Sequence, residues 1–260
     1  RMVSQVKTTN TFDGRNYSWE HNFSYDAQGR IKEVNSKIVH HRAAKFENTT
    51  RYYKCYITSK ANYYFEGKSF RVEYSISKEY PDYPSWNGVE SGKERGRFNS
   101  NGTLAKMSSK MSSMDFEYSA TQLQCAYSDG GYVYKPVRDS FGNVTGYTKL
   151  GMMNSESDTV VLDRSRDFLY SGIKNKTNFD FSGYFGYWGI EKGFMTLATE
   201  YYAPYQLTAF GMLGATSSHL PLRMIVRDSK GNVVNDAYGD RYHNGMWEFD
   251  EKECPVSFVD

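Results

Sequence analysis

The fold of this chain is decided by residues 19–30, which read WEHNFSYDAQGR. The first seven residues alternate aromatic or His side chains with polar ones, a period of two that is typical of a strand with one buried face. The last five form an Asp-x-x-Gly turn, in which the Asp side chain caps backbone N–H groups and the Gly accepts a positive φ. The stretch therefore predicts a strand that runs directly into a hairpin.

The same turn phrase returns along the chain. Copies with Gly in the fourth position begin at residues 26, 139 and 228, a variant with Asn in place of Asp begins at residue 99, and a copy at residue 250 has Glu253 in place of Gly. Strand-like alternation occurs again around residues 70–76, 114–120 and 123–127, with further turns predicted at residues 66–67, 129–131 and 244–245. Successive antiparallel hairpins are therefore expected along most of the chain.

One segment has a helical pattern. Pro204 suits the first helical position, Leu207, Phe210 and Leu213 recur at helical spacing, and Gly214 is the predicted stop. The stretches 79–96 and 107–113 are interpreted as loops. No composition break marks a second domain, so residues 1–260 are expected to form a single β-rich domain.

Composition limits the classes of function. There are 32 basic and 30 acidic residues, which argues against a nucleic-acid partner, and no apolar stretch is long enough to cross a bilayer as a helix. The sequence opens at Arg1, which is compatible with a removed leader or lipid anchor and equally with trimming. The three Cys residues (Cys55, Cys125, Cys254) have no metal-site spacing, so buried free thiols are expected, with one long-range disulfide as the alternative.

The search for chemistry is negative. His40 and His41 are adjacent and would face opposite sides of a strand, so they cannot ligate one ion. Residues 180–183 (DFSG) lack the first Gly of a nucleophile elbow, and residues 183–189 (GYFGYWG) lack the Lys of a phosphate loop. We therefore expect no catalytic residue, no metal and no cofactor, and the chain is predicted not to be an enzyme.

Aromatic residues are the remaining candidates for ligand binding. The chain is 17% aromatic, with 23 Tyr. Rings in a Pro-containing loop or between glycines could form a binding rim or pack on their own sheet, and the helix could line an apolar groove or only the core. The candidate ligand-binding residues are Tyr80, Tyr83, Trp86, Tyr184, Tyr187, Trp188, Leu207 and Phe210.

The chain resembles the DUF4595 family of Bacteroidetes envelope proteins in its Asp-x-x-Gly turns and in the segments 203–205 (APY), 210–214 (FGMLG) and 219–221 (HLP), followed by the hairpins of residues 223–259. The chain departs from that pattern at Glu253, where Gly is expected. The turn phrase also resembles the YD repeat of bacterial surface and toxin shells, but its irregular spacing here argues against a solenoid. The DUF4595 resemblance implies a strongly curved antiparallel sheet, a porin-like or LolA-like half-barrel or open barrel, with one or two short helices on the concave side.

The resemblance also implies an exported protein, periplasmic or on the cell surface, and members often look like lipoproteins. The leading hypothesis is a non-catalytic binding module for an apolar, amphiphilic (lipid-like) or glycan ligand, or for an envelope protein partner. The alternatives are a structural or interaction protein with no small ligand, in which the aromatic face and the helix form only the core, and a carbohydrate-active hydrolase.

Overall fold

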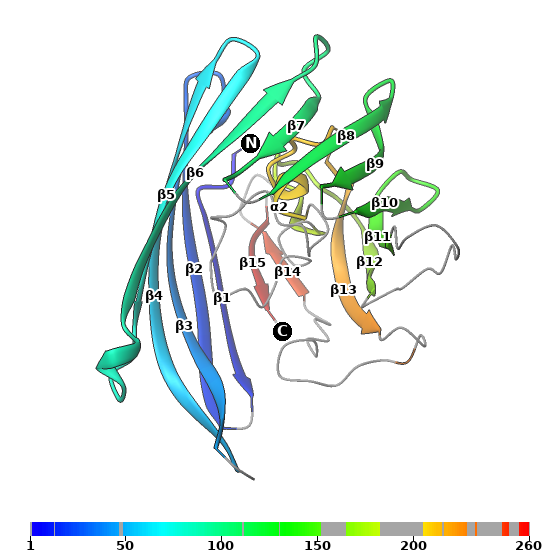
Figure 1. Cartoon of the computed structure of the whole chain (residues 1–260). Helices are drawn as coiled ribbons and strands as arrows, with labels where there is room; N and C mark the ends of the chain where they lie inside the picture. Colours follow the sequence, from blue (N-terminus) through cyan, green and yellow to red (C-terminus); the bar gives the residue numbers. More distant parts are fainter. Residues whose placement is uncertain are drawn as a thin grey trace. The chain divides into compact units, whose positions relative to one another are not determined.

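The computed structural model describes residues 2–12, 14–46, 49–110, 112–129, 131–151, 165–182, 205–214, 216–227, 232, 246–249 and 255–259. The protein is mainly β (Figure 1). Eleven strands form an antiparallel sheet whose spatial order follows the chain, from β1 to β11. Two further pairs, β12–β13 and β14–β15, are separate two-stranded sheets. Among the described residues no ladder joins β1 to β11, so the large sheet is not closed.

Contacts divide the chain into two compact units, an N-terminal unit made chiefly of Val3–Arg95 and a C-terminal unit made chiefly of Gly96–Gly189 and Leu197–Asp260. The single-domain organisation expected from the sequence stays a prediction. Within the described residues no helix is both long enough and apolar enough to cross a membrane.

The N-terminal unit consists of long neighbouring strands, drawn in blue to cyan in Figure 1. Its elements are β1 (Gln5–Phe12), β2 (Arg15–Tyr25), β3 (Ile31–Phe46), β4 (Thr49–Glu66), β5 (Ser69–Glu79), the 3₁₀ turn η1 (Pro84–Trp86) and most of β6 (Gly88–Phe98). On β2 the residues Tyr17, Trp19, His21 and Phe23 are buried and those between them are more exposed. The alternation predicted from residues 19–25 is confirmed, and it gives these strands one buried and one exposed face.

The C-terminal unit contains shorter elements. They are β7 (Leu104–Ser108), β8 (Ser113–Ser119), β9 (Gln122–Ser128), β10 (Tyr132–Arg138), β11 (Val144–Gly151), β12 (Ser165–Lys174), α2 (Tyr205–Ala209), β13 (His219–Arg227), β14 (Met246–Phe249) and β15 (Pro255–Val259). Cys125 on β9 and Cys55 on β4 are buried free thiols, as expected, and Cys254 lies outside the described residues.

The Asp-x-x-Gly turns are confirmed as hairpin turns. Gly29, Gly102 and Gly142 have φ of 78°, 84° and 83°. Each of these glycines donates its backbone N–H to the carbonyl of the residue that opens its turn, at 3.0, 3.2 and 3.0 Å. The glycine of the copy at residue 228 lies outside the described residues.

Strand register extends this result to the copy without Gly. Tyr25 pairs with Ile31, Arg138 with Val144 and Phe249 with Pro255, and each pair follows a register shift of the same kind. The last hairpin therefore keeps the spacing of the others, although its turn residues are not described.

The loop predicted over residues 79–96 is wrong in its second half, because β6 occupies residues 88–96. Between β5 and β6 the chain forms the turn that contains η1. Strand β6 lacks apolar alternation because its more buried positions include Gly92, Glu94 and Gly96. The ring of Tyr74 on β5 lies over Gly92, since a Cβ added there would sit 2.3 Å from Tyr74 Oη. An aromatic ring from the neighbouring strand thus fills the space that a side chain would normally take. The loop predicted over residues 107–113 is likewise shorter, because β7 ends at Ser108.

The predicted helix is present but shorter than expected. It spans Tyr205–Ala209. The glycine that stops it is Gly211, and not Gly214 as predicted. The N–H of Gly211 bonds to Thr208 O and that of Met212 to Leu207 O, both at 2.9 Å, and Gly211 has a φ of 66°. This is the Schellman arrangement with glycine in the left-handed position. Pro204 lies outside the described residues.

Candidate functional site

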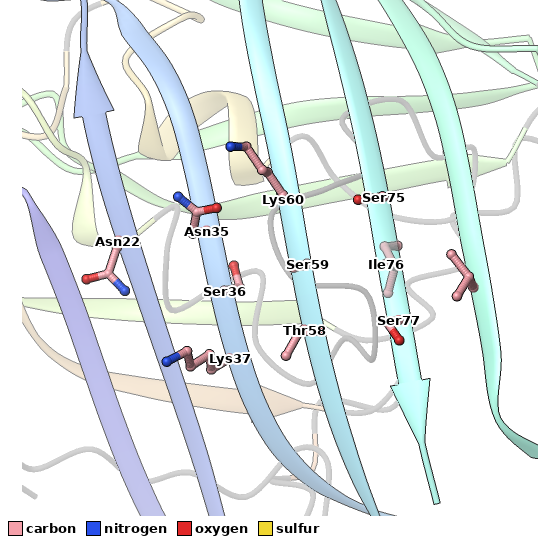
Figure 2. A pocket seen from close by; sticks show the side chains of 11 residues that line it. Asn22, Asn35, Ser36, Lys37, Thr58, Ser59, Lys60, Ser75, Ile76 and Ser77 are labelled. Atoms are coloured by element: carbon pink, nitrogen blue, oxygen red, sulfur yellow. The ribbon is translucent and has the colours of Figure 1, made fainter. Parts of the chain in front are cut away.

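A hollow of about 310 Å³ lies on the N-terminal unit, across strands β2 to β6 (Figure 2). Its lining residues are mostly polar by type, although apolar atoms make up most of the surface they expose, and they come from five neighbouring strands: Asn22, Asn35, Ser36, Lys37, Thr58, Ser59, Lys60, Ser75, Ile76, Ser77 and Val89. Most of these side chains are half-buried or exposed. The hollow is therefore open to solvent.

Strand register brings these residues together. One row of cross-strand partners runs Asn22, Asn35, Lys60, Ser75. A second row, two residues further along each strand, runs Glu20, Lys37, Thr58, Ser77. Because residues two apart on a strand share a face, both rows lie on the exposed face of the sheet. Figure 2 shows these side chains, apart from that of Glu20, spread over four adjacent strands.

Two amides at one end of the hollow are held by side-chain hydrogen bonds. Asn22 accepts from Gln5 Nε2 at 2.7 Å and donates to Glu20 Oε1 at 3.2 Å. Asn35 donates to Glu33 Oε1 at 2.6 Å. Both amides are therefore oriented before any ligand arrives.

The two lysines of the hollow differ in their partners. Lys60 pairs with Glu33 at 2.6 Å. The hydrogen bonds from Lys60 and Asn35 lower the pKa of that carboxyl, so the pair is ionised at neutral pH. Lys37, which is exposed, has no carboxylate within ion-pair distance among the described residues.

The middle of the hollow is a floor of hydroxyl groups. Thr58, Ser75 and Ser77 are exposed, and within the part of the chain that the structure describes their side chains make no hydrogen bond to protein. A hydroxyl both donates and accepts, so these three groups can bond to a ligand that carries hydroxyls. The exposed side chain of Val89 supplies an apolar edge.

The buried face behind this floor carries a few polar groups among apolar ones. His21 Nδ1 lies 2.7 Å from Ser36 Oγ, and both residues are buried. Burial lowers the pKa of His21 to about 3, so the ring is neutral at pH 7. Ser59, the register partner of Ser36, is also buried, and its hydroxyl has no hydrogen-bond partner among the described residues. On this face the contact between His21 and Ser36 links β2 to β3.

Three of the sequence-predicted residues lie together elsewhere in the same unit. The rings of Tyr83 and Trp86 stack with centroids 4.9 Å apart, and Tyr80 meets Trp86 edge-on at 5.6 Å. Tyr53 of β4 packs against both Tyr83 and Trp86, and Arg42 lies 5.5 Å from the Trp86 ring centroid. Tyr80 is buried and the other two predicted residues are half-buried. The rings fold back onto their own strands, and their role in binding stays a prediction.

The other predicted site residues belong to the C-terminal unit or are not described. Leu207 is fully buried on α2, and Phe210 is half-buried against Phe179 at 6.2 Å. Tyr184, Tyr187 and Trp188 lie outside the described residues. A ligand-binding role for these five residues stays a prediction.

Sequence reasoning missed every residue of the hollow. Its polar side chains look like ordinary positions on solvated strands, and only register makes them neighbours. A signal was present, because the turn at residues 26–30 places Asn22 opposite Asn35 and the turn at Gly67 places Lys60 opposite Ser75. The register of the predicted hairpins therefore indicates that these residues are cross-strand neighbours.

No His, Cys, Asp or Glu residue is among those that line the hollow. Among the described residues no three His, Cys, Asp or Glu side chains lie close enough together to hold a metal ion. Ser182, the residue nearest to a nucleophile-elbow pattern, is fully buried and donates its hydroxyl hydrogen bond to Asp180. What the hollow offers is hydrogen bonding and positive charge.

Comparisons with known proteins show the fold. No protein-family model matches the chain, and no curated protein matches it by sequence. The solved structure of a porin-like protein from Bacteroides uniformis is similar, with a TM-score of 0.50 and 10% identity. The match covers 97% of this chain and 87% of that one. At this identity the likeness concerns architecture, and the chain shares the mainly β fold of that porin-like protein.

Proposed function

We propose that this protein is a non-catalytic binding module of a bacterial envelope, and that its ligand is a glycan held on the exposed face of β2 to β6. The hollow beside Thr58 and Ser75 carries this proposal. Its floor offers hydroxyls without protein partners among the described residues, one end offers two fixed amides, and Val89 offers an apolar edge. Sugars present the same mixture of hydroxyls and small apolar faces, whereas an acyl chain would leave these polar groups unpaired.

The envelope location rests on resemblance. The Bacteroides protein of similar fold is described as porin-like. The turn phrase and the segments at residues 203–221 resemble the DUF4595 envelope family, whose curved half-barrel with helices on its concave side is part of the proposal. Export, with or without a lipid anchor, follows from the same resemblance.

A glycan-array screen followed by calorimetry tests the proposal. Replacing Thr58 by Leu removes one hydroxyl and fills part of the floor, so we expect affinity for a glycan hit to fall about tenfold. Thr50→Leu is the matched control, because Thr50 is an exposed residue of the same type on the same face of β4, outside the hollow. It should bind like the wild type.

Circular dichroism should show that both variants are folded. A wild-type protein that binds no glycan on the array would overturn the proposal, and so would equal affinity in the two Thr variants.

A further inference from the structure

The lysines on the exposed face of β1 to β6 whose side chains the structure describes fall into two groups. Lys7, Lys60 and Lys93 each meet a carboxylate, at 3.9, 2.6 and 2.9 Å. Lys37 and Lys54 meet none among the described residues. On a face where lysines are otherwise neutralised in pairs, these two positive charges are left to solvent or to a ligand.

The two unpaired lysines lie on one line. Lys37 is opposite Thr58 and Lys54 is opposite His41, so their rows are four residues apart on β3 and β4. At the rise of a strand this separation is about 13 Å. All four positions share the exposed face, because they differ by even numbers along each strand.

The residues between Lys37 and Lys54 on this face are aromatic and apolar. Val39 pairs with Tyr56, whose ring is 38% exposed, and Lys54 Nζ lies 5.0 Å from the centroid of that ring. Sugar rings pack their C–H faces on such surfaces, and an anionic substituent could draw the ammonium group away from the ring.

Two acidic residues lie beside the line from Lys37 to Lys54. Glu20, beside Lys37, is engaged by Lys7, and Glu79, beside Tyr56, lies on the β5 side. His41 adds no charge at neutral pH, because burial and then the nearby His40 and Lys54 lower its pKa. The positive side chains along the line are therefore the two lysines, together with Arg15 near His41, where the guanidinium lies 3.9 Å from the centroid of the Tyr52 ring.

We infer that the ligand is an elongated acidic glycan that lies along β3 and β4, with anionic groups at Lys37 in the hollow and at Lys54 beyond Tyr56. This inference rests on the proposed function and names its ligand class. The span of about 13 Å requires several sugar units, since a single sugar ring cannot reach both charges. Carboxylate and sulfate substituents would satisfy the lysines by the same chemistry.

The test compares four probes by calorimetry on the intact chain: a neutral hexasaccharide, its uronic-acid counterpart, a sulfated hexasaccharide and an oligothymidylate of similar charge. We expect at least one acidic hexasaccharide to bind about tenfold more tightly than the neutral one. Preference between the two acidic probes identifies the substituent. Equal binding of the neutral probe would overturn the inference and leave the proposed function standing. Equal binding of the oligothymidylate would overturn the assignment to glycans.

Variants locate the charges. Lys37→Gln and Lys54→Gln should each weaken binding of the acidic hexasaccharide about five- to tenfold. Lys93→Gln, an exposed lysine of the same face with its own carboxylate, is the matched control and should change affinity less than twofold, as for a distant surface charge. An acidic disaccharide should be sensitive to Lys37→Gln and insensitive to Lys54→Gln. Loss of affinity from Lys93→Gln equal to that from Lys37→Gln would contradict the inference.

Discussion

The turns at residues 26–30 and 139–143 have the same phrase and the same hairpin register but different surroundings. In the first, Asp26 accepts the backbone N–H groups of Gln28 and Arg30, both at 2.9 Å. In the second, Asp139 accepts those of Phe141 and Asn143, also at 2.9 Å. The backbone geometry is thus repeated almost atom for atom.

The residue after the glycine separates the two turns. Arg30 is exposed, pairs with Asp26 at 2.6 Å and lies 4.3 Å from the Phe65 ring centroid. Asn143 is fully buried and donates to Asp139 Oδ2 at 2.8 Å. Its oxygen accepts from Ser218 Oγ at 2.9 Å and from the backbone N–H of His219 at 3.2 Å.

The second turn therefore joins the hairpin of β10 and β11 to the start of β13. Ser217, next in the chain to Ser218, extends the same contacts. Its backbone N–H donates to the buried Asp180 at 2.6 Å, and its hydroxyl lies 3.0 Å from Tyr170 Oη. One phrase can thus close a hairpin in solvent or connect distant segments, depending on a single side chain.

Replacing Asn143 by Arg and Arg30 by Asn should give the largest difference in stability between the two turns. Asn143→Arg would force a larger, charged side chain into a fully buried position and remove the hydrogen bonds to Ser218 and His219, so we expect the unfolding free energy to fall by about 3 kcal/mol or more. Arg30→Asn loses an exposed ion pair and ring contact, a cost of about 1 kcal/mol or less. Urea denaturation of both variants measures the difference. Equal losses would show that the docking contacts contribute little.

Replacing the glycine of each turn by alanine should destabilise the two turns by similar amounts. Gly29 and Gly142 have φ of 78° and 83°, and a Cβ added to Gly142 meets no atom within 4 Å. The cost is then that of the left-handed conformation, about 1–2 kcal/mol at each position. Urea midpoints for Gly29→Ala and Gly142→Ala should shift by similar amounts. A clearly larger shift at one position would mean that the two backbones are under different constraint.

Acid titration should show the smallest difference. Desolvation raises the pKa of both Asp side chains, but hydrogen bonds outweigh it, so both pKa values are lowered. The bonds come from Arg30 and Gln28 at Asp26, and from Asn143 and Phe141 at Asp139. A carboxyl with a lowered folded-state pKa stabilises the fold above its unfolded value near 3.8, and this contribution is lost as pH falls through the folded value.

At pH 7 the variants Asp26→Asn and Asp139→Asn should therefore be less stable than the wild type. The difference in unfolding free energy between each variant and the wild type should become smaller as pH falls below about 4. Urea midpoints at pH 7, 5 and 3 measure it, and a gap that does not change with pH would contradict the assignment. The larger gap is expected at Asp139, because its partner Asn143 is buried.

Much of the architecture was predictable because its signals are local. A period of two followed by a turn phrase needs only neighbouring residues, and those strands were found. The strand β6 was missed because its buried positions include Gly92 and Gly96, and the ring that fills the space comes from Tyr74 on another strand. The helix stop was misplaced because Gly211 and Gly214 are both glycines, and only backbone hydrogen bonds distinguish them.

The candidate site was harder to predict because its members are weak signals individually. Lys37, Thr58 and Ser75 belong to three strands, and each is an ordinary residue of an exposed face. They form one site only through the cross-strand register, which adds up over successive hairpins. Aromatic residues such as Tyr80 gave stronger signals and were chosen instead, although this ring is buried.

Local residue patterns are enough to predict most of the described reversals of this chain and the buried faces of strands such as β2. Turn chemistry and alternation act over a few residues, and few competing structures satisfy them. The burial of Asn143, the exposure of Arg30 and the position of the β4 and β5 hydroxyls beside Lys37 and Lys60 depend on the tertiary structure. Those outcomes depend on which strands become neighbours and on what packs against each turn, and the residues involved are far apart in the chain.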